Sequence, residues 1–193
     1  MTFLIGIEGL PGSGKTTAIE KLIPRFQSLG ISVEMIDIET TLHAPTLRAI
    51  ARTYPLGHTI RTLLFWILRL HQYETGQEKI DSMDIIIMDR YWGSTIAFDF
   101  YGNQVPMKVL DWAGREIKKY PDVTLFFNAP LEVVRSRKKA KTINDEAFAQ
   151  RLAAGYLQLA KKHNWAEIDA TKDVEEVAED CFKIILERYK QKK

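Results

Sequence analysis

The sequence lacks the features that would place it among disulfide-linked, membrane or nucleic-acid-binding proteins. Its only cysteine, Cys181, excludes an internal disulfide and, on an apolar helical face, is expected to be a core thiol. The longest apolar run, residues 63–68, is far shorter than the roughly 20 residues that cross a bilayer. The 27 Lys and Arg against 25 Asp and Glu leave a net charge of only +2, without the one-sided basicity of a protein that binds nucleic acid. We therefore expect neither a membrane nor a nucleic-acid partner.

A secretion signal and a metal-binding histidine pattern are also missing. The N-terminal apolar run, residues 3–7, has no positive segment before it and is followed by Glu8, which fits a buried strand better than a signal peptide. The histidines lie too far apart in sequence for a standard metal site. We expect a cytoplasmic protein that binds anionic ligands through local clusters of basic residues.

Apolar runs of strand length alternate with longer amphipathic stretches, which predicts an α/β fold of parallel strands joined by helices. Two runs, residues 85–88 and 123–127, are apolar at consecutive positions, as in central strands covered on both faces. A first helix is predicted over residues 15–29, ended by Gly30. A last helix is predicted to begin at Asp173, whose carboxylate can cap it while Glu176 reaches back. All 193 residues are expected to form one domain. The predicted strands are residues 2–8, 32–37, 84–89, 122–128 and 165–169.

A phosphate-binding motif, G-x-x-x-x-G-K-S/T, stands between the first strand and the first helix. Glycines let backbone N–H groups turn inward around a polyphosphate, and the helix N-terminus adds partial positive charge. Lys15 would bridge the outer phosphates of ATP. The alternative, a plain glycine turn, does not account for this context. The predicted nucleotide-binding residues here are Gly9, Leu10, Pro11, Gly12, Ser13, Gly14, Lys15, Thr16 and Thr17.

A magnesium site is expected beside this loop. The Thr16 hydroxyl is one predicted ligand, and Asp89, at the end of an apolar strand, is the acid that would hold the metal shell. An aspartate at a strand end can also simply cap the next turn, and that interpretation stays open.

The rest of the chain favours a kinase over a GTPase. The guanine-reading pattern N/T-K-x-D is absent, whereas Arg90 follows Asp89 directly and a basic cluster occupies residues 135–141. Phosphoryl transfer is catalysed by positioning and by cationic stabilisation, so arginines on two sides of the loop suit it. A solvated helix face remains the alternative reading of the basic cluster.

Several segments resemble the thymidylate kinase family, and the likeness covers nearly the whole chain. The resemblance implies the three-layer α/β/α P-loop kinase fold, with the five strands in the order 2-3-1-4-5, and ATP-dependent phosphorylation of dTMP to dTDP with Mg²⁺. It also implies a homodimer. The segments that carry it are Ile7-Glu8-Gly9 with the phosphate loop, Leu64 to Arg69, Asp89-Arg90-Tyr91 with Ser94 and Ala97-Phe98, Gly155-Tyr156-Leu157, and Ile168-Asp169-Ala170.

The resemblance implies roles for individual side chains. Arg90 would contact the acceptor phosphate and the migrating group, Phe65 would stack on the base, and Arg69 would contact it. Thr95 and Phe98 would line the sugar and base pocket. Phe65, in an apolar stretch, also fits a core position, whereas Arg69 demands a partner if it is buried.

A lid is implied near residues 135–147, somewhat short for the family. Because the phosphate loop holds no arginine, the catalytic cation would come from this lid, with Arg137 favoured over Arg135. Thr171 would lie in the loop near adenine. The expected catalytic residues are therefore Lys15, Arg90 and Arg137.

Three features depart from the family pattern. Pro11 stands where an acid usually meets the sugar hydroxyl, Phe98 replaces a tyrosine, and residues 38–43 do not match the usual R-E-P-G-G-T. The arginine that reads the acceptor phosphate would be Arg48, Arg52 or Arg61. Two other functions stay open: a kinase for nucleosides or other small acceptors with Glu39 as general base, and an ATP-binding relative that has lost catalysis.

Overall fold

The computed structural model describes residues 1–38, 44–53, 57–115, 120–137 and 145–192. Its five strands form one parallel sheet in the order β2-β3-β1-β4-β5. The predicted α/β fold and strand order are confirmed, and each strand begins one residue after its predicted start. The strands are β1 (Phe3–Gly9), β2 (Val33–Asp37), β3 (Ile85–Asp89), β4 (Val123–Asn128) and β5 (Ala166–Asp169).

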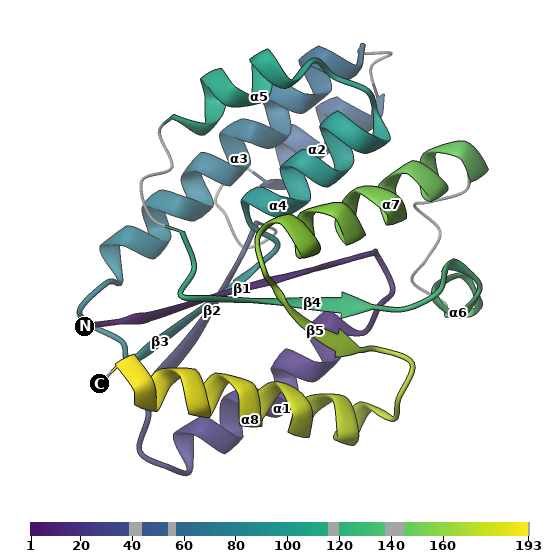
Figure 1. Ribbon diagram of the computed structural model, residues 1–193. Coiled ribbons are helices and arrows are strands. Elements are labelled where there is room, and N and C mark those ends of the chain that lie inside the picture. The colour runs from purple at the N-terminus through teal and green to yellow at the C-terminus, as the bar shows by residue number, and fades with distance from the viewer. Residues whose placement is uncertain (39–43, 54–56, 116–119, 138–144, 193) are drawn as a thin grey trace.

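Helices cover both faces of the sheet (Figure 1). One face carries α1 and α8, and the other carries α3, α4 and α7, with α5 outside them. In the described part of the chain, no helix is both long and apolar enough to cross a membrane. The helices are α1 (Lys15–Gln27), α2 (Ala44–Thr53), α3 (His58–Glu78), α4 (Trp92–Thr95), the π-helical η2 (Ile96–Gly102), α5 (Met107–Gly114), α6 (Leu131–Ser136), α7 (Glu146–Lys162) and α8 (Val174–Lys192).

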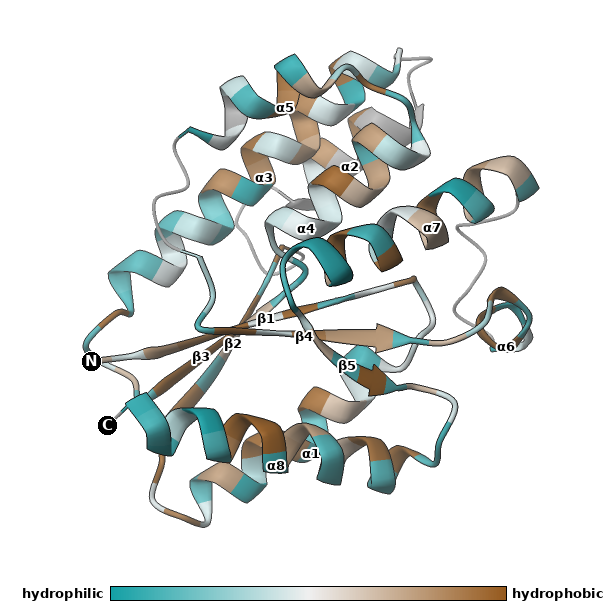
Figure 2. Cartoon of the chain, viewed as in Figure 1, coloured by the Kyte–Doolittle hydropathy of each residue, from teal (hydrophilic) through white to brown (hydrophobic). Residues whose placement is uncertain are grey.

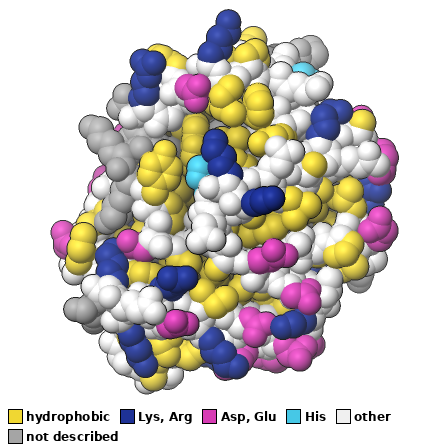
Figure 3. All heavy atoms as spheres, viewed as in Figure 1, with side chains coloured by type: hydrophobic (Ala, Val, Ile, Leu, Met, Phe, Trp, Pro, Cys, Tyr) yellow, Lys and Arg dark blue, Asp and Glu magenta, His cyan; other side chains and the backbone are white. Residues whose placement is uncertain are grey.

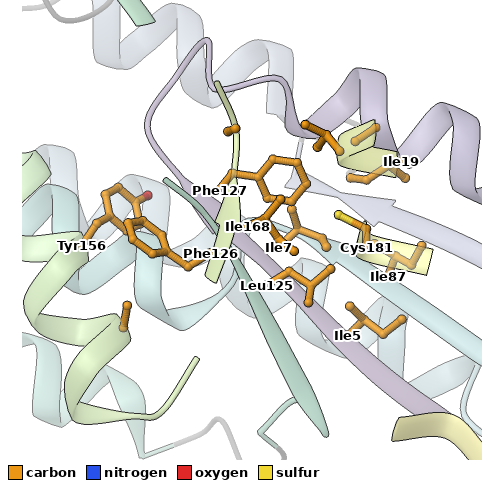
Figure 4. Close-up of a cluster of buried hydrophobic side chains, with 14 of the residues drawn as sticks. Ile5, Ile7, Ile19, Ile87, Leu125, Phe126, Phe127, Tyr156, Ile168 and Cys181 are labelled. Atoms are coloured by element: carbon orange, nitrogen blue, oxygen red, sulfur yellow. The ribbon is translucent and has the colours of Figure 1, made fainter. Parts of the chain in front are cut away.

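The core lies on the two faces of the central strands. Every residue of β1 and β3 is buried, as expected for strands covered on both sides. Successive side chains alternate between the faces: Phe127 packs among the residues on the α1 and α8 side, whereas Phe126 faces Tyr156 of α7 (Figure 4). Figure 2 shows hydrophobic residues along the strands, whereas hydrophobic and hydrophilic residues alternate along the helices.

Local signals set the helix ends. Gly30 has the left-handed φ of +73° predicted for a helix stop, although α1 ends at Gln27, two residues earlier than expected, because its last turn tightens to i→i+3 hydrogen bonds. At the start of α8, Glu175 N donates to Asp173 Oδ1 (2.9 Å) and Asp173 N to Glu176 Oε2 (3.3 Å), so the predicted cap is confirmed.

Charges on the surface are interspersed by sign rather than gathered into one field, as Figure 3 shows for one face. Several are paired locally, including Lys172 with Asp180 at 2.7 Å and Arg25 with Glu179 at 2.6 Å. This agrees with the near-zero net charge and leaves anion binding to particular sites.

Parallel pairing brings the carboxyl ends of the strands to one edge. Ile7 pairs with Asp89 and Gly9 with Phe127, so β1, β3 and β4 end side by side. This edge is where ligands bind in open parallel sheets.

Candidate active site

The segment after β1 forms a tight loop that ends at the N-terminus of α1. Gly9, Gly12 and Gly14 have φ values of +141°, +84° and +92°, which side chains rarely adopt. A Cβ on Gly9 would also lie 2.7 Å from the main-chain oxygen of Phe127. The glycines are therefore required by the loop shape, which directs backbone N–H groups and the helix dipole toward a bound anion.

Lys15 is held inside this loop. Its side chain is 4% exposed, and Nζ donates to Leu10 O (2.7 Å), Gly9 O (3.2 Å) and Ser13 Oγ (3.2 Å). Burial lowers the pKa of the ammonium well below its ordinary value; Arg90 adds to this, and Asp89 opposes it. An anion in the loop would stabilise the charged form of this amine.

Asp89 and Thr16 face each other across the loop. Thr16 Oγ1 lies 3.4 Å from Asp89 Oδ2. Asp89 Oδ1 is buried and has no hydrogen-bond partner among the described residues, which is uncommon for a buried carboxylate oxygen. A hydroxyl and an unpaired carboxylate oxygen are hard ligands of the kind Mg²⁺ takes when phosphates and water complete its shell.

Arg90 reaches across the same edge of the sheet. Its backbone has a left-handed φ of +62°. Nη1 donates to Gly9 O (3.0 Å) and Tyr156 Oη (3.1 Å) and lies 3.4 Å from Ser94 Oγ. The guanidinium carbon lies 5.5 Å from the centre of the Phe98 ring. The structure thus brings two sequence-predicted residues, Arg90 and Phe98, together beside the loop.

Arg69 and Phe65 lie one turn apart on α3. Phe65 is 37% exposed, so the alternative that it is a core residue is wrong. Arg69 is 6% exposed, and burial lowers the pKa of its guanidinium. Its Nη1 donates to Gln72 Oε1 (2.6 Å) and to the main-chain oxygen of Arg90. The partner that a buried arginine requires is therefore the backbone of the catalytic candidate.

Gln72 secures this contact from the other side. Its Nε2 donates to Ile36 O (2.8 Å) and Asp89 O (3.1 Å), which joins the ends of β2 and β3 to α3. The turn that carries Asp89 and Arg90 is consequently held by two neighbouring side chains of one helix.

The arginines near the predicted lid differ in their partners. Arg137 donates from Nη1 to Gly12 O (3.3 Å) and from Nη2 to Ala170 O (2.8 Å), so it spans the phosphate loop and the β5–α8 loop. Arg135 pairs with Glu146 at 2.6 Å instead. Arg137 is thus placed at the glycine loop and Arg135 away from it.

A cavity of about 440 Å³ lies beside the loop, between the ends of β4 and β5 and helix α7. Leu10 and Thr171, both predicted nucleotide-binding residues, line it together with Tyr156. The Thr171 hydroxyl donates to Asp169 Oδ1 (2.6 Å).

Known proteins resemble the chain over most of its length. The family model described as thymidylate kinase matches residues 7–181. The chain is 32% identical to probable thymidylate kinase 1 of Saccharolobus solfataricus over 191 residues, covering 96% of this chain and 97% of that protein. It is 29% identical to thymidylate kinase of Mycoplasma capricolum (97% and 96% covered) and 28% identical to that of Staphylococcus haemolyticus (96% and 98%).

The chain belongs to the thymidylate kinase family. It is a nucleoside monophosphate kinase of the type that uses ATP to phosphorylate dTMP to dTDP.

The remaining predicted thymidylate kinase residues are placed as follows. Thr95 is 6% exposed in α4, next to η2, whereas Thr17 is exposed on α1. Arg61 Nε is buried, with no acceptor in the described ranges. Arg48 and Arg52 belong to α2, but their side chains lie outside what the structure describes, and Glu39 lies outside the described residues altogether.

Four residues of this candidate site had no predicted role: Glu8, Gln72, Ser94 and Tyr156. Glu8 is 1% exposed. An acidic residue within an apolar strand needs partners if it is buried, so its position in the sequence could have indicated a role. For Gln72 and Tyr156 no local pattern identifies a role, because their contacts come from other elements.

Proposed function

We propose that this chain binds Mg²⁺ and ATP at the glycine loop and presents dTMP from the side of α3 and η2. The observation that carries the assignment is the position of Lys15, Asp89 and Arg90 at one edge of the sheet, within contact of the same loop. Thr16 and Asp89 would hold Mg²⁺, which when bound neutralises phosphate charge and orients the outer phosphates.

On the donor side, the loop amides and Lys15 would bind the β- and γ-phosphates. Arg137, which already contacts both the loop and Ala170, would face the transferred group from the lid side. Arg135, paired with Glu146, would hold the lid and contact ATP only secondarily. Thr171 would border the adenosine end.

On the acceptor side, Phe65 would stack on the thymine, and Arg69 would contact its edge. Phe98 and Thr95 would border the sugar. Arg90 would bind the acceptor phosphate, with Arg48 as a further contact. An oxygen of dTMP then attacks the γ-phosphorus as the bond to the bridging oxygen of ADP breaks, and the cations stabilise the charge spread over the migrating group.

An acceptor panel tests this function. Purified protein with Mg²⁺ and ATP is given dTMP, dUMP, dCMP, thymidine or deoxycytidine, and ADP release is measured. We expect the highest kcat/KM with dTMP. Turnover confined to the nucleosides, or tight ATP binding by calorimetry without acceptor-dependent ADP, would contradict the proposal.

The broader organisation is also proposed. The whole chain, residues 1–193, would act as one domain with a lid near residues 135–147, in the cytoplasm where free nucleotides are available. A homodimer is supported by α3, on which Ile60 and Ile67, one heptad apart, are 53% and 54% exposed.

A further inference from the structure

The hydroxyl of Tyr156 lies between Arg90 and Ser94. Arg90 Nη1 is 3.1 Å and Ser94 Oγ is 2.8 Å from Tyr156 Oη. The Tyr156 side chain is fully buried, and its ring stacks on that of Phe126 (Figure 4), with the two centroids 6.0 Å apart. Packing therefore fixes the ring, and the ring fixes where its hydroxyl can bond.

The chain of hydrogen bonds continues to a buried carboxylate. Ser94 Oγ donates to Glu8 Oε2, and the main-chain N–H groups of Tyr91 and Ser94 each donate to Glu8 Oε1 at 3.0 Å. Glu8 directly precedes the glycine loop, so one side chain of β1 holds the turn that follows Arg90.

The direction of these hydrogen bonds follows from the chemistry of the two end groups, the Arg90 guanidinium and the Glu8 carboxylate. A guanidinium only donates and a carboxylate only accepts. With the Ser94 proton given to Glu8, Tyr156 must donate to Ser94 and accept from Arg90. Two hydroxyls thus connect a cation to an anion through bonds that all point the same way, an arrangement in which each bond strengthens the next.

This arrangement orients the guanidinium. In the part of the chain that the structure describes, every hydrogen bond from the Arg90 side chain leaves from Nη1, toward Gly9, Ser94 and Tyr156. The rest of the group is left to meet phosphate. We propose that Tyr156, with Ser94 and Glu8, is a positioning residue that holds Arg90 in the orientation needed for phosphoryl transfer; this rests on the proposed role of Arg90.

The test compares two buried tyrosines. Tyr156→Phe removes the hydroxyl but keeps the ring. Tyr189→Phe is the control, because the Tyr189 hydroxyl also donates to a carboxylate, Asp84 Oδ1 at 3.0 Å, at the opposite edge of the sheet. We expect kcat with dTMP to fall about tenfold in Tyr156→Phe, with KM for ATP unchanged, and to stay at the wild-type value in Tyr189→Phe.

A double-mutant cycle separates positioning from general stability. Ser94→Ala interrupts the same series of hydrogen bonds at the next residue. The double variant Tyr156→Phe/Ser94→Ala should therefore lose little more kcat than the worse of the two single variants. Additive losses, a wild-type kcat in Tyr156→Phe, or equal loss in Tyr189→Phe would overturn the proposal.

Arg90→Ala distinguishes this failure from failure of the proposed function. An inactive Arg90→Ala beside a fully active Tyr156→Phe would overturn the positioning role alone. An active Arg90→Ala would overturn the catalytic assignment itself.

Discussion

Arg69 donates a hydrogen bond from Nη1 to the main-chain oxygen of Arg90. The residue proposed to read the base thereby contacts the backbone of the residue proposed to bind the acceptor phosphate. Arg90 has a left-handed backbone conformation, which costs free energy for a residue with a side chain and persists only where neighbours hold it. The proposed recognition of the base and the placement of the turn that carries Arg90 would therefore share one side chain.

Replacing Lys15 with methionine should nearly abolish turnover. The ammonium is the only part removed, and its charge is what would stabilise the migrating phosphoryl group. We expect kcat to fall roughly a hundred- to a thousand-fold in a coupled ADP assay. Lys21→Met is the matched control on the same helix, because Lys21 pairs with Glu175 away from the loop and should keep wild-type activity.

Asp89→Asn should raise the magnesium requirement. The amide keeps the size of the side chain but loses the charge and one of the two oxygens that would coordinate the metal. A titration of activity against Mg²⁺ should show the half-saturating concentration rising at least about tenfold. Asp111→Asn, at an exposed position of α5, should follow the wild-type titration. An unaltered curve for Asp89→Asn would remove Asp89 from the metal site.

Phe65→Ala should weaken acceptor binding without unfolding the protein. The ring is 37% exposed, so little core packing is lost, whereas stacking on a base is worth about 1–3 kcal/mol. We expect KM for dTMP to rise about tenfold or more, with KM for ATP and the melting temperature nearly unchanged. An unchanged KM for dTMP would contradict the stacking role, and a large fall in melting temperature would show that the ring contributes to stability as well.

Stability should depend on pH through Asp99, which is buried against α3 and accepts from Thr62 Oγ1 at 2.8 Å. Burial raises the pKa of this carboxyl above 3.8, although the Thr62 and Asn103 hydrogen bonds oppose the shift. The folded state therefore binds the proton more tightly than the unfolded state, so the contribution of Asp99 is greatest below pH 3.8. It is lost as pH rises through the pKa of the folded protein.

The comparison with Asp99→Asn isolates this effect, because the asparagine does not titrate. Urea denaturation at a series of pH values should show the wild type losing stability relative to Asp99→Asn as pH rises from about 4. A difference that stays constant would show that Asp99 has the same pKa in the folded and unfolded states, and one that grows in favour of the wild type would show that its partners stabilise the carboxylate.

Ile67→Glu should convert the proposed homodimer into a monomer, because a charge would be buried in the interface. Light scattering after size exclusion measures the mass. Leu29→Glu is the control: Leu29 is also 54% exposed, but it follows α1 on the opposite side of the sheet (Figure 1) and should leave the mass unchanged. If Ile67→Glu has the wild-type mass, α3 is not the interface.

The phosphate loop and the acid at the end of β3 were predictable from short segments. A glycine pattern constrains the backbone locally, and parallel strands end at a common edge, so Lys15 and Asp89 could be placed together without coordinates. Helix ends were predicted almost as well, because caps act over a few residues; Asp173 is an example.

The contacts of Arg69 and Arg90 were not predictable in this way. The position of Arg69 among apolar residues indicated that it needs a partner. That partner lies 21 positions away and is a backbone oxygen, which every residue has. The Tyr156 hydroxyl meets Arg90 across 66 positions. Whether Phe65 is buried in the core or exposed was likewise decided by how α3 packs.

The amino-acid sequence by itself determined the phosphate-binding loop, because its residues lie next to one another along the chain and act through local backbone geometry. The Asp89-Arg90-Tyr91 segment and the missing guanine-reading pattern then indicated a kinase. Only the tertiary structure decided how the Arg90 side chain is oriented. That orientation depends on hydrogen bonds between β1, β3, α3 and α7, whose distances and directions exist only once those elements have packed.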